Sequence, residues 1–314
     1  MMMHVLGMFG LALTGLQPQD MSAAGPLRVQ IDDLEVDYPV FFAAVLPEEV
    51  IEIEVQGRPD ERSIRFAAPD AGQSIEGPVS LSWQAPTEPG HHQIMVSDSL
   101  SGDEMLINIF VMVPATKVQD GVLNGYRIGE YPATPLRGLN VYKPPLGFIA
   151  VNDETRDVQL SPHFTLGQFI CKQDTTAPER YVVLQPQLLK KLEDAVDLLE
   201  ADGFDPDTLF VMSGYRTPFY NKAIGNVPYS RHVYGDAADV YLDVAPRDGD
   251  MDDLNRDGQI DKADAHYLYD MIAAFGGEDT TVRIQGGIGS YDRNAVHGPF
   301  VHIDTRGTPA RWGR

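Results

Sequence analysis

The sequence predicts an α+β protein in two folded parts, a small all-β sandwich domain followed by a domain of mixed helices and strands. Short alternating segments separated by turn residues fill the chain up to about residue 115. Beyond residue 160, one helical repeat and several scattered strand-like segments follow, without the regular strand–helix–strand order of a parallel sheet. With 314 residues, 43% of them hydrophobic, the chain is long enough to bury the cores of two domains.

The first residues have the pattern of a signal peptide. The run from Val5 to Leu16 is apolar but too short to span a bilayer, and the small residues Ser22 and Ala24 follow it. The usual positive charge before the apolar run is missing, because no Lys or Arg precedes Arg28. We expect residues 1–25 to be a signal peptide, the protein to be exported, and the mature chain to have no transmembrane span.

Residues 30–115 carry the strand pattern that predicts a sandwich of the immunoglobulin-like type. The segment VIEIEV at 50–55 alternates branched apolar residues with glutamate, so one face of this strand is buried and the other is solvated. Further apolar segments follow between turn sequences: SIRFAA, VSLSWQA, HQIMVS and MLINIFVMV. No motif here points to chemistry, so we expect a spacer or docking domain.

Residues 116–160 are rich in Gly and Pro and are expected to link the two domains. This linker also carries several aromatic residues, which predicts that it packs on its neighbours: Tyr126, Tyr131, Tyr142 and Phe148.

The second domain is expected to cover residues 161–314. Apolar residues recur at helical spacing between positions 188 and 199, and Gly203 follows as a stop signal. The segments 208–216, 237–244 and 300–305 have the pattern of strands.

Charge and cysteine content exclude some functions. The net charge of -22 repels nucleic acid and anionic membranes, so we expect no nucleic-acid partner. Cys171, the single cysteine, forms no internal disulfide, and its apolar neighbours predict a buried, inert thiol. The oligomeric state is left open.

The stretch SRHVYGDAADV at 230–240 suggests a metal site. His232 and Asp239 are ordinary zinc ligands, and a loop turning at Gly235 into a strand would bring them to one point. Two ligands do not close a site, and His302 in GPFVHIDTRG is the best candidate for a third. A lone histidine on an apolar strand is as a rule structural, so the pairing stays open on these residues alone.

Three motifs, in order, carry a family resemblance. The stretch SRHVYGDAAD fits the pattern Ser-x-His-x-x-Gly-x-Ala-x-Asp, with SGYRT (213–217) upstream and FVHID (300–304) downstream. They resemble the motifs of the zinc D-Ala-D-Ala carboxypeptidase and murein endopeptidase superfamily, which shares its fold with hedgehog signalling domains. LSPHFTLGQFIC resembles the start of a bacterial branch of these peptidases. The resemblance covers about residues 160–314.

The resemblance implies a zinc ion held by His232, Asp239 and His302, with Arg216 supporting substrate and oxyanion. Three protein ligands with one open position are the arrangement of a catalytic zinc site. A guanidinium is always charged and binds an oxyanion through two donors.

The sequence departs from the family pattern at the general base, since no glutamate occurs shortly before His302. Asp304 and His297 are the remaining candidates. Asp304 shares a strand face with His302, so it either reaches the site or orients the ligand.

Residues 253–264, DLNRDGQIDKAD, predict a calcium loop of the EF-hand type, similar to the loops of dockerin modules. The oxygen ligands expected are Asp253, Asn255, Asp257, Gln259, Asp261 and Asp264, with Gly258 at the sharp turn. We expect the loop to belong to an insertion at 245–278 inside the zinc domain, where a structural Ca²⁺ would stiffen it.

These features together predict a zinc metallopeptidase that cleaves peptidoglycan stem peptides or their cross-links, in the periplasm or cell envelope of a bacterium. Which bond is cut, and whether the enzyme is a carboxypeptidase or an endopeptidase, stays open. The alternative is a non-catalytic zinc-binding module that recognises cell-wall peptide or a protein partner.

Overall fold

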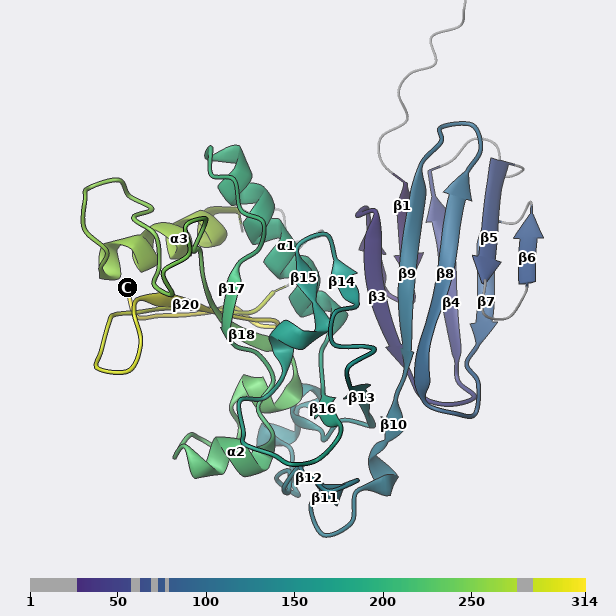
Figure 1. The fold of residues 1–314 in the computed structure, drawn as a ribbon, viewed down its shortest axis with the longest axis horizontal. Coiled ribbons are helices and arrows are strands. Elements are labelled where there is room, and N and C mark those ends of the chain that lie inside the picture. Colours follow the sequence, from purple (N-terminus) through teal and green to yellow (C-terminus); the bar gives the residue numbers. More distant parts are fainter. Residues whose placement is uncertain (1–26, 58–62, 69–72, 77–78, 276–284) are drawn as a thin grey trace, which may run out of the picture.

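The computed structural model describes residues 27–57, 63–68, 73–76, 79–275 and 285–314 (Figure 1). The predicted signal peptide, and the last residues of the predicted 245–278 insertion, lie outside these ranges. Within them, no helix combines the length and apolar character needed to cross a membrane.

The N-terminal part consists of two sheets, which lie one behind the other in Figure 1. The first has the order β2-β1-β4-β7, with β1 (Arg28–Ile31), β2 (Leu34–Val36), β4 (Val50–Gln56) and β7 (Ser80–Gln84). The second has the order β3-β9-β8-β5-β6, with β3 (Val40–Val45), β5 (Ile64–Ala68), β6 (Gln73–Glu76), β8 (Gly90–Asp98) and β9 (Glu104–Val111). In β4 the alternation predicted from VIEIEV holds, because Ile51 and Ile53 are buried while Glu52 and Glu54 are exposed.

The segment expected to be a linker is folded. β10 (Val113–Pro114) and η3 (Ala115–Lys117) lead into it. It holds β11 (Val122–Leu123), β12 (Tyr126–Arg127), β13 (Gly147–Val151), the short 3₁₀ helices η4 (Leu136–Gly138) and η5 (Asn140–Tyr142), and the start of β14 (Gln159–Ser161). β13 pairs with β10 and with β16 (Arg180–Val182), so it joins the C-terminal part through a sheet. Its aromatic residues Tyr126 and Phe148 are almost fully buried, which ties this segment to its neighbours.

The C-terminal part combines helices with a sheet of order β17-β18-β20-β19-β21. Its strands are β17 (Phe210–Ser213), β18 (Ala237–Tyr241), β19 (Gly287–Tyr291), β20 (Phe300–Asp304) and β21 (Ala310–Trp312). The other elements are β15 (Phe164–Thr165), η6 (Leu166–Phe169), α1 (Pro186–Ala201), α2 (Pro218–Ala223), η7 (Arg231–Tyr234) and α3 (Lys262–Phe275). The helical repeat in the sequence corresponds to α1, whose apolar stripe is buried.

The N- and C-terminal parts share one continuous apolar core. Polar contacts also join them: Asn108 Nδ2 on β9 donates a hydrogen bond to the Gln159 carbonyl on β14 at 2.8 Å. The Tyr38 hydroxyl donates to Asp197 Oδ2 on α1 at 3.1 Å. The zinc domain predicted from sequence therefore packs against the N-terminal sheets through both apolar and polar contacts.

Candidate metal centre

A tight turn brings His232 and Asp239 together. His232 lies on η7, and the helix ends at Gly235, which has φ +74°. A Cβ atom at this position would lie 2.3 Å from the Val183 carbonyl oxygen, so only glycine fits the turn. The chain then enters β18, where Asp239 is buried. The turn glycine expected from the sequence is therefore required both by its backbone angle and by its surroundings.

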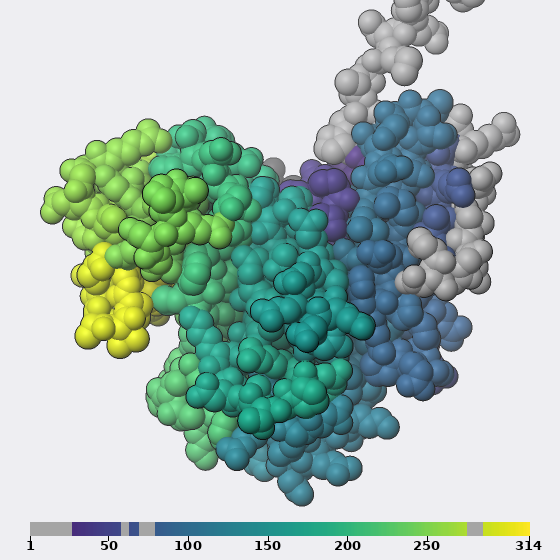
Figure 2. Space-filling view, in the orientation of Figure 1, coloured from purple at the N-terminus to yellow at the C-terminus, as the bar shows by residue number. Residues whose placement is uncertain are grey.

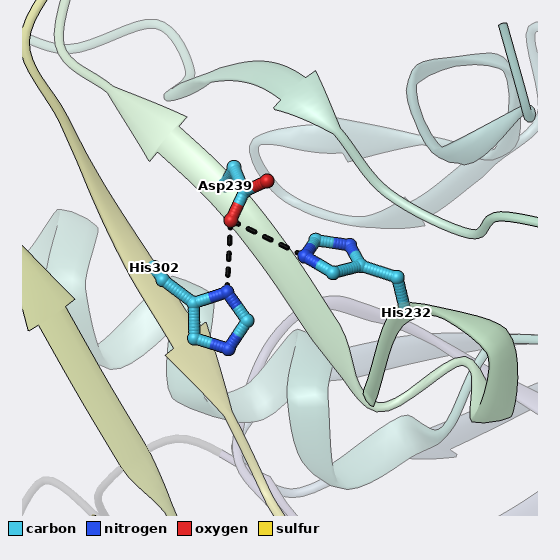
Figure 3. Close-up of side chains that lie close together, drawn as sticks. All are labelled: His232, Asp239 and His302. Atoms are coloured by element: carbon cyan, nitrogen blue, oxygen red, sulfur yellow. Dashed lines mark hydrogen bonds and ion pairs between the residues drawn. The ribbon is translucent and has the colours of Figure 1, made fainter. Parts of the chain in front are cut away.

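Strand pairing supplies the third residue of the group. β18 and β20 are antiparallel neighbours, and their register sets Asp239 directly opposite His302. Opposed residues on paired strands point to the same face of the sheet. Asp239 Oδ1 lies 3.2 Å from His232 Nε2 and 2.8 Å from His302 Nδ1, and Figure 3 shows the two rings converging on this oxygen.

The three side chains form the His–Asp–His group, and all are buried. Each offers one ligand atom, and these atoms lie within 4.8 Å of one another. Among the residues that the structure describes, no other set of three or more His, Cys, Asp or Glu side chains meets this condition.

The second nitrogen of each histidine has its own partner. His232 Nδ1 lies 2.7 Å from the Gly214 carbonyl oxygen, to which it donates its hydrogen. His302 Nε2 lies 3.1 Å from Asp304 Oδ2 and donates there. When the rings are neutral, the lone pairs of His232 Nε2 and His302 Nδ1 are thereby directed at the centre of the group, as in a metal site with oriented ligands.

The ionisation of the group follows from burial and close charges. Burial alone raises the pKa of Asp239, but the two histidines hold it well below its ordinary value. Burial lowers the pKa of His232. Burial acts the same way on His302, but its hydrogen bonds to Asp239 and Asp304 outweigh it and raise the pKa. Asp239 is therefore a carboxylate at neutral pH, the form that binds a metal.

Arg216 completes the surroundings of Asp239. Its Nη2 donates to Asp239 Oδ2 at 2.5 Å and its Nε donates to Ser213 Oγ at 2.8 Å. Thus Asp239 Oδ1 contacts the two histidines, and Asp239 Oδ2 accepts the hydrogen bond from Arg216. Within the described residues, Arg216 Nη1 donates to no protein acceptor, so it is free to bind a ligand.

The group fits zinc on the chemistry of its donors. Two neutral imidazole nitrogens and one carboxylate oxygen are ordinary zinc ligands, and three of them suit a catalytic site with one open position. His232, Asp239 and His302 would hold the ion.

A cavity of about 410 Å³ opens directly on the His–Asp–His group, and we call it the metal-site pocket. Its walls carry three arginines and several aromatic rings: Arg216, Arg231, Arg306, Tyr142, Tyr229, Tyr291, Phe300 and Trp312. In Figure 2 a hollow separates the yellow C-terminal residues from the green residues around α2, and both sides contribute to these walls.

Asp304 lies behind His302 and is fully buried, away from the walls of the pocket. It accepts hydrogen bonds from the Gly287 N–H at 2.8 Å and from Arg306 Nε at 2.9 Å. Burial opposes its ionisation, but the bonds from His302 and Arg306 keep its pKa far below the ordinary value. Of the two roles left open by the sequence, this geometry favours orienting His302 over accepting a proton.

His297 lies in the loop before β20 and does not line the pocket. Its Nε2 lies 2.6 Å from Asn294 Nδ2, which donates to it, and its Nδ1 lies 2.8 Å from the Gly298 carbonyl oxygen. Both ring nitrogens are therefore engaged, which disfavours His297 as a general base.

Sequence reasoning did not place Tyr142, Arg306 or Trp312 at the metal centre. Arg306 forms a salt bridge with the buried Asp304, and Tyr142 comes from the segment expected to be a linker. One feature of the sequence could have indicated Trp312. In GGIG at 286–289, Gly287 and Gly289 lie on the same face of a strand and leave space there for a large ring from a neighbouring strand.

The predicted calcium loop has a turn held by its own side chains. Gly258 has φ +85°, and its N–H donates to Asp253 Oδ2 at 2.7 Å. Asp264 is fully buried, and its Oδ1 accepts from the Leu254 N–H at 2.9 Å. The loop carboxylates do not form a group of the kind found at the metal centre. Calcium binding by this loop therefore stays a prediction.

Residues 162–263 match the family model described as Peptidase M15. The match supports a metallopeptidase of the zinc D-Ala-D-Ala carboxypeptidase-like superfamily and confirms the resemblance implied by the sequence motifs. The matched segment contains Arg216, His232 and Asp239, while His302 lies beyond it and is brought in by the sheet. No curated protein and no solved structure matches the chain.

Proposed function

We propose that the protein is an exported zinc peptidase that hydrolyses amide bonds in peptidoglycan stem peptides or their cross-links. The observation that carries this proposal is the buried His–Asp–His group, whose histidines are each oriented by a second hydrogen bond beside an open pocket. A structural zinc site would be closed by a fourth protein ligand.

The chain's own residues have distinct parts in this reaction. When bound, zinc would lower the pKa of a water molecule and polarise the scissile carbonyl. Arg216 is held by Asp239 and Ser213, so its free Nη1 is pre-positioned to donate to the carbonyl oxygen as negative charge develops there. Asp304, Arg306 and the Gly287 N–H keep the ring of His302 in place.

The charge of the pocket supports an acidic peptide as the substrate. Three arginines line it, and each is ion-paired with a buried aspartate: Arg216 with Asp239, Arg231 with Asp236 and Arg306 with Asp304. Peptidoglycan stem peptides carry free carboxylates, which are attracted to a site of net positive charge. Because the three ion pairs balance, a zinc ion at the His–Asp–His group would give the pocket a net positive charge and so favour these anionic groups.

A non-catalytic zinc module is the second candidate, and one observation favours it. Among the described pocket residues there is no free carboxylate or histidine to accept a proton, because Asp304 and His297 both lie outside the walls. A module of this kind would bind the same cell-wall peptide without cleaving it.

Digestion of murein sacculi separates the two candidates. Purified protein is incubated with sacculi, with and without a chelator, and released peptides are identified by mass spectrometry. We expect chelator-sensitive release, lost together with zinc content in His232→Ala, while His266→Ala, which changes a half-buried residue of α3 outside the pocket walls, keeps both. Binding to sacculi without release of any peptide would overturn the peptidase in favour of the module.

Export, the sandwich and calcium belong to the same proposal. The N-terminal two-sheet part would be a sandwich domain that docks or spaces the peptidase in the cell envelope. The loop at 253–264 would bind Ca²⁺ weakly, at the millimolar concentrations found outside cells. Titration calorimetry on the wild type and Asp257→Ala tests this, with binding heat expected only for the wild type.

A further inference from the structure

The C-terminal strand lies against the metal centre. β21 runs parallel to β19, and the register pairs Trp312 with Gly289. The strand lies outside the segment matched by the family model, so its contribution comes from the structure alone. It closes one edge of the sheet whose central strands carry Asp239 and His302.

Trp312 packs directly beside a metal ligand. The centroid of its ring lies 5.2 Å from that of His302. Its Nε1 donates a hydrogen bond to the Tyr291 hydroxyl at 2.9 Å, which sets the orientation of the indole. The Arg306 guanidinium lies over the ring, 5.5 Å from its centroid. Trp312 is thus fixed from three sides while it also lines the metal-site pocket.

The strand beneath Trp312 is shaped to receive it. A Cβ atom at Gly289 would lie 2.2 Å from the indole ring, and one at Gly287 would lie 2.9 Å from it. Any larger residue at these positions would displace the ring from the His–Asp–His group. The placement of this ring at the pocket therefore depends on two glycines in the neighbouring strand.

We propose that Trp312 is a specificity-determining residue, which limits the volume of the side chain next to the scissile amide. This inference rests on the proposed peptidase function. An amide carbonyl bound at the His–Asp–His group would place one of its flanking residues against the indole, because the ring lies beside His302. A rigid wall of this size admits small side chains and rejects bulky ones.

Because the chain has two tryptophans, the position of Trp312 beside the metal centre can be tested directly by fluorescence. Trp83 lies on β7 in the N-terminal part, so Trp83→Phe leaves Trp312 as the single tryptophan reporter. We expect one equivalent of Co²⁺ to quench the emission of Trp312 in the Trp83→Phe protein, and no quenching in Trp83→Phe/His232→Ala. Emission unaffected by bound Co²⁺ would contradict the placement of the ring beside the metal centre.

The role in specificity is tested with synthetic stem-peptide analogues that carry alanine, leucine or phenylalanine beside the cleaved amide. Trp312→Ala should raise kcat/KM for the phenylalanine peptide relative to the alanine peptide by about tenfold, the discrimination expected from apolar pocket size. Trp312→Phe preserves a flat ring and should keep most of the wild-type preference. An equal loss for all peptides in both variants would indicate a purely structural residue and overturn the inference.

Failure of the peptidase proposal is distinguishable from failure of this inference. If the wild type cleaves none of the peptides, their binding to the zinc-loaded Trp83→Phe protein is followed by Trp312 emission. A spectral shift that is larger for the alanine peptide than for the phenylalanine peptide would support the inference without activity. Equal or absent shifts would reject it.

Discussion

At the scale of single residues, the partners of the two histidines decide what the metal centre can bind. Gly214 and Asp304 each accept the hydrogen of one ring nitrogen, which leaves the other nitrogen directed at Asp239. Asp239 in turn divides its oxygens between the histidines and Arg216. Loss of an orienting partner should therefore weaken metal binding even though no ligand is removed.

Asp304→Asn tests this expectation. The variant keeps the shape of the side chain but loses the charge that holds His302 and Arg306, so zinc affinity should fall by roughly 10- to 100-fold. Competition with a chromogenic chelator measures the affinity. The control is Asp292→Asn, which changes an exposed carboxylate outside the pocket walls. Unchanged affinity with loss of cleavage would instead identify Asp304 as the base.

The pH dependence of zinc binding follows from the same bonds. Zinc requires neutral histidines, so protons compete with the metal as the pH falls. Because the pKa of His302 is raised by its carboxylate partners, this competition should begin above the ordinary histidine value of about 6.5. Zinc affinity, measured by competition between pH 8 and pH 5, should decrease steadily with acidification. In Asp304→Asn the decrease should begin at a lower pH, because one of these partners has lost its charge.

At the scale of elements, the metal centre depends on one turn and one register. η7 ends at Gly235 and β18 begins two residues later, which turns His232 back toward Asp239. A one-residue slip of β20 against β18 would move His302 to the opposite face of the sheet. Lys191 on α1 helps to hold this strand, since its Nζ donates to the Asp304 carbonyl at 2.8 Å.

Two glycines with nearly equal backbone angles, Gly225 and Gly235, test how strongly the turn between η7 and β18 requires glycine. Gly225 has φ +73° and no atom near the position of a Cβ, while Gly235 has φ +74° and the Val183 carbonyl in that position. Gly225→Ala should lower the free energy of unfolding by about 1–2 kcal/mol, the cost of the left-handed conformation. Gly235→Ala should cost about 2–5 kcal/mol, because a backbone clash is added. Urea denaturation of both variants measures the difference; equal costs would show that the turn relaxes freely.

At the scale of the whole molecule, the N-terminal sheets and the peptidase part are packed as one body. One apolar core runs through both, and the segment between them is held by strands rather than hanging free. This packing predicts a single cooperative unfolding transition rather than one for each part.

The tryptophans report on the two parts separately. Trp83→Phe and Trp312→Phe each leave one reporter, on β21 in the C-terminal sheet and on β7 in the N-terminal part respectively. Their thermal transitions should coincide, and zinc at one hundred times its Kd should stabilise both by about 2.7 kcal/mol, because the ion binds only the folded state. Separate midpoints, with zinc moving only the Trp312 transition, would show that the two parts unfold independently.

The sequence by itself determined the local patterns and the motif residues. The alternation in VIEIEV predicted strand β4, and the helical spacing between positions 188 and 199 predicted helix α1. Both patterns can be read without knowledge of the tertiary structure. The family motifs likewise pointed to His232, Asp239 and His302. For residues 116–160 the aromatic residues predicted packing on the neighbouring parts, but the strands were not predicted, because the Gly and Pro content resembles that of a linker.

Only the tertiary structure decided how distant residues meet. Strand register set His302 directly opposite Asp239, the geometry that the motifs alone did not give, and Asp304 lies fully buried outside the pocket walls. Pairing of β21 with β19 brought Trp312 from the chain end to the metal centre. These contacts depend on which strands are neighbours in a sheet, and a single sequence records the faces of a strand but not its partners.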